Sequence, residues 1–156
     1  MKSIVADKIV DIKIKPLVDF INSFKGVETL GSCQGHDNGG QTGEWVYPYI
    51  KFKCLDNRSL GLLASIEYIY SDLRKLYRDL SEPELSKIYQ PKLKGIWTIE
   101  VLPNIDYHLR GYNGDYAVFV LKAHMDSFKK PSELYPDFDK ILHWYKAQLN
   151  SSLNGN

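Results

Sequence analysis

The sequence predicts an α+β fold, in which about three helices cover one face of a mainly antiparallel or mixed sheet. Segments with alternating apolar residues occur in consecutive pairs joined by short connections, which favours antiparallel pairing. Three further segments carry apolar residues at helical spacing, so each can cover the apolar face of a sheet. The sequence contains no GxGxxG or GxxxxGK(S/T) motif and therefore does not predict a doubly wound nucleotide-binding fold.

Length and composition predict one ordinary domain. The 156 residues suit a single α+β domain at residues 1–150, and the polar tail at 151–156 is expected to be disordered. A formal net charge of +1 gives no general attraction to nucleic acid, so charge does not favour RNA as a partner. No segment reaches the roughly 18 apolar residues of a membrane helix. Since two cysteines are also too few for a disulfide framework, we expect a cytoplasmic protein with no membrane partner. The sequence leaves the oligomeric state open.

The first half of the chain predicts a strand, a helix and a pair of strands. Residues 4–14 show a rough alternation of Ile and Val, which is typical of a short strand ending near Lys15. A helix is expected from Pro16 to Gly26, because apolar residues recur at i, i+3, i+4 and i+7 and glycine commonly ends helices. The next expected elements are a strand at 27–33, a glycine-rich loop at 34–43 and a cleanly alternating strand at 49–54.

The second half predicts a long helix, further strands and a final helix. The long helix should cover 58–80 with Asp56 or Asn57 as its cap, followed by a loop or short helix at 82–93. Its expected buried face consists of Leu62, Ile66, Ile69, Leu73, Leu76 and Leu80. The remaining expected elements are a strand at 96–102, a hairpin with arms at 105–111 and 116–122 around an Asn-Gly turn, and a helix at 133–149.

The turn after strand 27–33 concentrates reactive groups. A hydroxyl, a thiol, an amide and an imidazole follow one another in the turn Ser32-Cys33-Gln34-Gly35-His36. Loops held at the end of a rigid strand are common places for a binding or catalytic site. We therefore assign Cys33 and His36 as candidate catalytic residues. The candidate ligand-binding residues are Ser32, Gln34, Gly35, His108 and Arg110.

Several chemistries stay open for this turn. Cys33 and His36 can form a thiolate–imidazolium pair for nucleophilic catalysis. The backbone amides and polar side chains can instead cradle a small polar or nucleotide-like ligand. A metal site would need Asp37 and either His108 or His124 in addition, and because the ligand spacing is not that of a zinc motif, the sequence assigns no metal ligand. In the plainest interpretation, the motif is only a tight structural turn.

The turn and its flanking segments also resemble a known family. Residues 16–24 (PLVDFINSF), 26–36 (GVETLGSCQGH) and 48–54 (PYIKFKC) are similar to the tRNA wybutosine-synthesising methyltransferase family, in which a strand ends in Ser-Cys-Ser-Gly-Arg. Ser32, Cys33 and Gly35 match this motif, whereas Gln34 replaces a serine and His36 replaces the arginine. Small bacterial and phage proteins with Ser-Cys-x-Gly-His are similar as well, and they fit the histidine.

The resemblance implies S-adenosylmethionine as the cofactor and a modified guanosine in tRNA as the substrate. The absence of the arginine is a departure, because an imidazole cannot hold a phosphate or carboxylate in the bidentate way of a guanidinium. Two functions therefore stay open at this point. One is a small-molecule- or nucleotide-binding enzyme related to tRNA modification, and the other is a non-catalytic interaction or adaptor domain.

Overall fold

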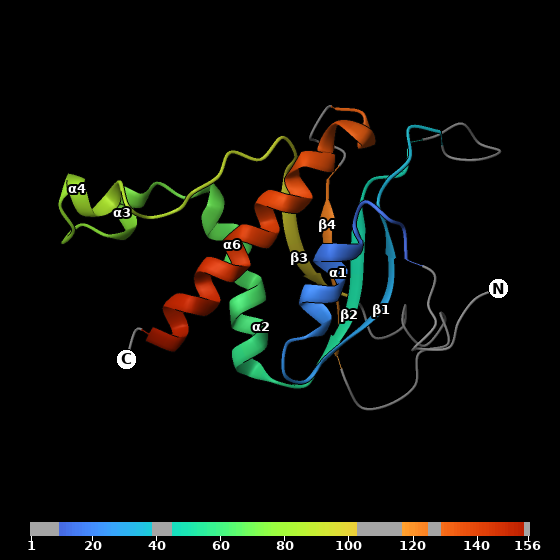
Figure 1. Ribbon diagram of the computed structural model, residues 1–156, viewed down its shortest axis with the longest axis horizontal. Helices are drawn as coiled ribbons and strands as arrows, with labels where there is room; N and C mark the ends of the chain where they lie inside the picture. The colour runs from blue at the N-terminus through green and yellow to red at the C-terminus, as the bar shows by residue number, and fades with distance from the viewer. Residues whose placement is uncertain (1–9, 39–44, 103–116, 125–128, 155–156) are drawn as a thin grey trace.

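The computed structural model describes residues 10–38, 45–102, 117–124 and 129–154, with side chains up to residue 150. Its centre is an antiparallel sheet of four strands in the order β1-β2-β4-β3. Three helices, α1, α2 and α6, lie on one face of this sheet (Figure 1). The predicted α+β fold is thus confirmed. The strands are β1 (Val27–Cys33), β2 (Tyr49–Cys54), β3 (Trp97–Val101) and β4 (Ala117–Ala123), and the three helices are α1 (Lys15–Asn22), α2 (Asn57–Ala64) and α6 (Tyr135–Asn154).

A β-bulge in β1 decides which face of the sheet carries Cys33. Thr29 pairs with Phe52 of β2, whose side chain is fully buried under the helices, but the register then shifts, so that Gly31 pairs with Lys51. Neighbouring residues of β2 point to opposite faces, and the shift therefore moves the rest of β1 to the other face. Cys33, paired with Tyr49, emerges opposite the helix-covered core. Both cysteines of the protein are free thiols.

A buried carboxylate ties α6 to the start of β3. Asp137 is fully buried and accepts hydrogen bonds from the backbone N–H groups of Lys94 and Gly95, each at 2.8 Å. It also accepts a bond of 2.9 Å from the indole N–H of Trp97, whose side chain is fully buried as well. A buried charge is tolerated when such donors replace water, so this contact fixes the last helix against the sheet.

The long helix expected over 58–80 is replaced by three short ones. They are α2, the 3-10 helix η3 (Ser65–Tyr70) and α3 (Leu73–Leu76). Asp56 caps α2 as predicted, by accepting from the backbone N–H of Ser59. The chain turns extended at Ser71, and Asp72 caps a new helix through the backbone N–H of Arg74. Ile66 and Ile69 are buried, but Leu76 is 45% exposed and Leu73 and Leu80 are only partly buried, so the second half of the predicted apolar face packs less closely against the described residues.

Other boundaries differ in smaller ways. Ile12 to Ile14 form a turn instead of the end of a strand, and the rest of the predicted first strand lies outside the described residues. Helix α1 ends at Asn22, before Gly26, whose φ of 73° belongs to the following turn. The first hairpin arm, 105–111, also lies outside the described residues, whereas β4 occupies the second arm.

The segment after the predicted long helix and the C-terminal tail are both helical in part. A short helix, α4 (Glu82–Leu85), begins the segment for which a loop or short helix was expected. Helix α6 follows a 3-10 turn, η5 (Pro131–Leu134), and continues to Asn154, so residues 151–154 are helical although the tail was expected to be disordered. Among the described residues, none of the helices combines the length and the apolar character that crossing a bilayer requires.

Candidate functional site

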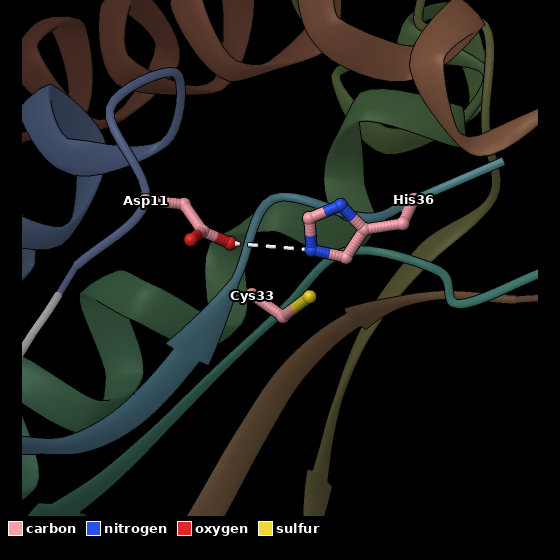
Figure 2. A group of neighbouring side chains, drawn as sticks. All are labelled: Asp11, Cys33 and His36. Atoms are coloured by element: carbon pink, nitrogen blue, oxygen red, sulfur yellow. Dashed lines mark ion pairs between the residues drawn. The ribbon is translucent and has the colours of Figure 1, made fainter. Parts of the chain in front are cut away.

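Three side chains from separate segments converge at the end of β1. Asp11 comes from the segment before α1, Cys33 is the last residue of β1, and His36 follows the turn. One carboxylate oxygen, the sulfur and one ring nitrogen all lie within 4.8 Å of one another. Figure 2 shows the three side chains pointing toward one another, with a dashed line from Asp11 to His36. We call this group the Asp–Cys–His cluster.

Gly35 makes the turn between Cys33 and His36 possible. Its φ is 91°, a conformation that residues with a Cβ rarely adopt. Its surroundings leave no room for a Cβ either, because such an atom would lie 2.9 Å from Cδ of Pro48 and 3.0 Å from the carbonyl oxygen of Val46. Beyond the turn, His36 exchanges two backbone hydrogen bonds with Val46, of 2.8 and 3.0 Å. The backbone that carries the imidazole is therefore fixed on both sides.

The side chain of Gln34 holds the turn to its neighbours. Its side-chain oxygen accepts a hydrogen bond of 2.9 Å from the backbone N–H of Lys13. Its side-chain NH₂ group donates one of 3.4 Å to the hydroxyl of Tyr135. The same hydroxyl donates to the carbonyl oxygen of Gly35 at 3.1 Å. Gln34, predicted to bind a ligand, thus connects the segment before α1 with the start of α6. This connection supports the position of Asp11 beside the turn.

Asp11 connects the backbone of the turn to the imidazole. Its Oδ2 accepts a hydrogen bond of 3.0 Å from the backbone N–H of Gln34 and lies 3.7 Å from Nε2 of His36. Sequence reasoning missed this residue, because it lies inside the segment interpreted as a strand and far from the motif. The nearby Pro16, in the first turn of α1, is the local sequence signal that could have placed Asp11 outside a strand, and residues 12–14 between them do form a turn.

Burial and charge keep the Cys33 thiol neutral. The residue is partly buried, and desolvation raises its pKa above the usual thiol range, with the negative charge of Asp11 acting in the same direction. The backbone N–H of Gly35 donates to the sulfur at 3.3 Å, which lowers the pKa without cancelling the rise. A neutral thiol needs a base before it can attack. A ring nitrogen of His36 and the carboxylate of Asp11 both lie within 4.8 Å of the sulfur, and the side chain of Asp11 also raises the pKa of the thiol through a hydrogen bond.

The metal site considered from the sequence needs a correction. Asp37 lies apart from the cluster, because its carboxylate accepts from the backbone N–H and the hydroxyl of Ser132, at 2.9 and 2.6 Å. These two bonds lower the pKa of Asp37. His124 contacts Thr98 and Glu100 on β3 instead. The carboxylate that joins Cys33 and His36 is that of Asp11.

The other predicted site residues have different outcomes. Ser32 pairs with Ile50 and Cys33 with Tyr49, so these neighbouring side chains lie on opposite faces of β1. Ser32 therefore faces away from the sulfur. His108 and Arg110 lie outside the described residues, and their part in the site stays a prediction.

A hollow of about 560 Å³ lies on the face of the sheet that carries Cys33. Tyr49, the strand partner of Cys33, forms part of its wall, together with Lys51 of β2 and Lys122 of β4. Its volume falls within the roughly 300–1,000 Å³ of small-molecule sites. The described residues that line it belong to β2, β3, β4 and the segments beside them, so the hollow lies across β2 from β1 and the cluster.

Comparisons of the chain with protein-family models, curated proteins and solved structures find no match. The class that can be stated comes from the fold and the site alone. The chain is an α+β protein with a four-stranded antiparallel sheet, and a carboxylate, a thiol and an imidazole meet at one end of its first strand.

Proposed function

We propose that the protein is a ligand-binding enzyme that uses the thiol of Cys33 as its nucleophile. In this proposal His36 accepts the thiol proton, and the nearby carboxylate of Asp11 stabilises the positive charge that the imidazole acquires. The observation that carries the proposal is the convergence of these three groups, within 4.8 Å, from three separate segments of the chain. A nucleophile next to a base, with a carboxylate close enough to stabilise the protonated base, is a common arrangement for covalent catalysis.

The raised pKa of Cys33 defines how such a reaction would begin. The thiol stays protonated near neutral pH, so general-base catalysis fits better than the thiolate–imidazolium pair considered from the sequence. His36 takes the proton while the sulfur attacks an electrophilic carbon of the ligand, and the leaving group departs with the bonding electron pair. The carboxylate of Asp11 then stabilises the imidazolium that forms, because it lies 3.7 Å from Nε2.

Alkylation of Cys33 by iodoacetamide tests this role of His36. In a Cys54→Ala background, Cys33 is the only thiol, and its alkylation rate can be measured at pH 7 in the presence of a chelator. We expect His36→Ala to lower this rate by roughly 10- to 100-fold, at or below the lower end of general-base contributions. The loss should shrink as the pH rises through the raised pKa of Cys33, because the thiolate then forms without a base.

His143→Ala is the matched control for this measurement. His143 lies 3.5 Å from a carboxylate oxygen of Asp139 and is exposed, as His36 is, but it belongs to α6 and not to the cluster. Its replacement should leave the alkylation rate unchanged. Equal rates in the wild type and in His36→Ala would show that the imidazole does not activate the sulfur.

S-adenosylmethionine is the ligand that the resemblance proposes, on the match of Ser32, Cys33 and Gly35. A ligand present at 100 times its Kd stabilises the folded state by about 2.7 kcal/mol. For a domain of this size we therefore expect millimolar S-adenosylmethionine to raise the melting temperature by roughly 5–10 °C. An unchanged melting temperature would count against methyl transfer but not against the thiol chemistry, which the alkylation experiment tests separately.

A second candidate is a non-catalytic interaction domain in which the motif is a structural turn. The contacts of Gln34 with Lys13 and Tyr135, and of Asp37 with Ser132, favour it, because they hold the turn against two other segments. In this case Cys33→Ala and His36→Ala would lower the melting temperature, while His36→Ala would not slow alkylation. The two candidates thus give opposite results in the same pair of measurements.

A further inference from the structure

The donor atoms of the Asp–Cys–His cluster are also a ligand set for a metal ion. A thiol, an imidazole and a carboxylate are the three side-chain types that bind Zn²⁺, and here one of each is present. The sequence gives no sign of this set, because Asp11 lies far from the turn and the neighbouring Asp37 is held by Ser132. Only the fold brings the carboxylate to the sulfur and the ring nitrogen.

The distances in the cluster are close to those of a bound ion. With zinc–ligand bonds of about 2.0–2.3 Å, tetrahedral ligand atoms lie roughly 3.3–3.6 Å apart. The carboxylate of Asp11 and Nε2 of His36 are already separated by 3.7 Å, and no pair in the cluster exceeds 4.8 Å. A contraction of about 1.5 Å at most is therefore enough, and small rotations of the partly exposed side chains of His36 and Asp11 can supply it.

The backbone around the cluster supports two of the ligands. The N–H of Gln34 donates to the carboxylate of Asp11, and the N–H of Gly35 donates to the sulfur of Cys33. Such donors orient metal ligands and reduce the negative charge that collects around the ion. Because Gly35 is enclosed by Pro48, Val46 and Pro131, the two N–H groups keep their directions without a bound ion.

We propose that Asp11, Cys33 and His36 bind a thiophilic divalent cation of the Zn²⁺ type through three protein ligands. With His36 47% and Asp11 34% exposed at their side chains, the fourth coordination position faces solvent and is open to water or a ligand. Mg²⁺ and Ca²⁺ do not fit the site, because they need six or more oxygen ligands and a sulfur is a poor one.

Binding of the ion has a consequence for the thiol. The sulfur forms a bond to the metal and its proton passes to the solvent, so the electron pair that would attack a ligand is shared with the ion. An occupied site therefore cannot use Cys33 as a nucleophile, and the cation acts as an inhibitor of that chemistry. This consequence rests on the proposed function, whereas binding of the cation does not.

Titration of the metal-free protein with Zn²⁺, followed by calorimetry, tests the proposal. We expect one ion per chain with a Kd below about 1 µM, and no binding of Mg²⁺ at the same concentrations. Asp11→Asn, Cys33→Ala and His36→Ala should each weaken binding by more than about 100-fold, beyond the 10- to 100-fold loss typical of changes around the metal ligands. Cd²⁺ should produce the ultraviolet charge-transfer absorption of a thiolate–cadmium bond in the wild type and not in Cys33→Ala.

The controls separate this site from other metal-binding side chains. His143→Ala changes an imidazole–carboxylate pair on α6, and Cys54→Ala changes the second thiol, so both variants should retain the wild-type Kd. The absence of stoichiometric Zn²⁺ binding, or an unchanged Kd in His36→Ala and Asp11→Asn, would overturn the proposal. These two replacements are at partly exposed positions, and asparagine keeps an oxygen for the N–H of Gln34, so both variants should fold.

Alkylation distinguishes failure of the metal site from failure of the proposed function. If both inferences hold, one equivalent of Zn²⁺ suppresses alkylation of Cys33, and a chelator restores the His36-dependent rate. If Zn²⁺ binds but alkylation in chelator does not depend on His36, the metal site stands and the thiol mechanism fails. The opposite pattern, with His36-dependent alkylation and no bound Zn²⁺, overturns only the metal site.

Discussion

Asp137→Ala is expected to destabilise the protein by about 3–5 kcal/mol, because three N–H groups, one partly buried and two buried, would lose their acceptor. The donors are the backbone of Lys94 and Gly95 and the indole of Trp97, all within 2.9 Å of the carboxylate. Since domains are stable by only about 5–15 kcal/mol, this is a large part of the total. Chemical denaturation should show the loss as a lower midpoint with an unchanged slope.

Asp139→Ala is the matched control on the same helix. Its side chain is 75% exposed and pairs with His143 at the surface, so we expect a change within about 0.5 kcal/mol. Asp137→Asn should destabilise the protein less than Asp137→Ala, because the amide oxygen can still accept a hydrogen bond. It should still lower the stability of the wild type, because the new NH₂ group faces other N–H donors. A loss below about 1 kcal/mol in Asp137→Ala would show that the contact does not anchor α6.

Gly35→Ala is expected to cost about 2–3 kcal/mol and to disturb the Asp–Cys–His cluster. The φ of 91° is unfavourable for alanine, and the new Cβ would lie within 3.1 Å of Pro48, Val46 and Pro131. The turn must therefore change its backbone path, and Cys33 and His36 move apart because Gly35 lies between them. Thermal unfolding should show the lower stability, and alkylation of Cys33 should lose its dependence on His36.

Gly31→Ala provides the comparison within the same strand. A Cβ at Gly31 meets no heavy atom within 4 Å, and its φ lies outside the left-handed region. We expect this replacement to change stability by at most about 0.5 kcal/mol, and in the stabilising direction, because alanine restricts the unfolded chain. Similar effects of the two replacements would mean that the turn relaxes around the added methyl group.

Strand β2 could be predicted most directly from the sequence because its alternation reflects one buried face. Strands β1 and β2 have the predicted bounds, and β2 alternates between buried and partly exposed residues along its whole length. The segment 58–80 could not be predicted in the same way. Its helical spacing continues through Leu73 and Leu76, but helix length depends on tertiary partners, and beyond Tyr70 these side chains have little to pack against.

The candidate site could be predicted only in part. The motif itself indicates that Cys33 and His36 lie close together, because only two residues separate them and the second, Gly35, forms a turn. The third member could not be inferred, since the hydrogen bond from Gln34 to Asp11 and the one from Lys13 to Gln34 depend on where α1 packs. Sequence proximity favoured Asp37 as the carboxylate beside Cys33 and His36 for the same reason, whereas the structure places Asp37 against Ser132 and Asp11 beside the two residues.

The register shift in β1 makes the spacing of this strand as important as its composition. Between Thr29, whose side chain lies on the core face, and Cys33, the chain contains one residue more than a regular ladder would use. If the same residues paired without the bulge, Cys33 would lie four positions after Thr29 and on the same face, among Phe52 and the aliphatic side chains under the helices. A homologue whose first strand has this length but pairs without a bulge would thus keep every letter of the motif and have an inert thiol.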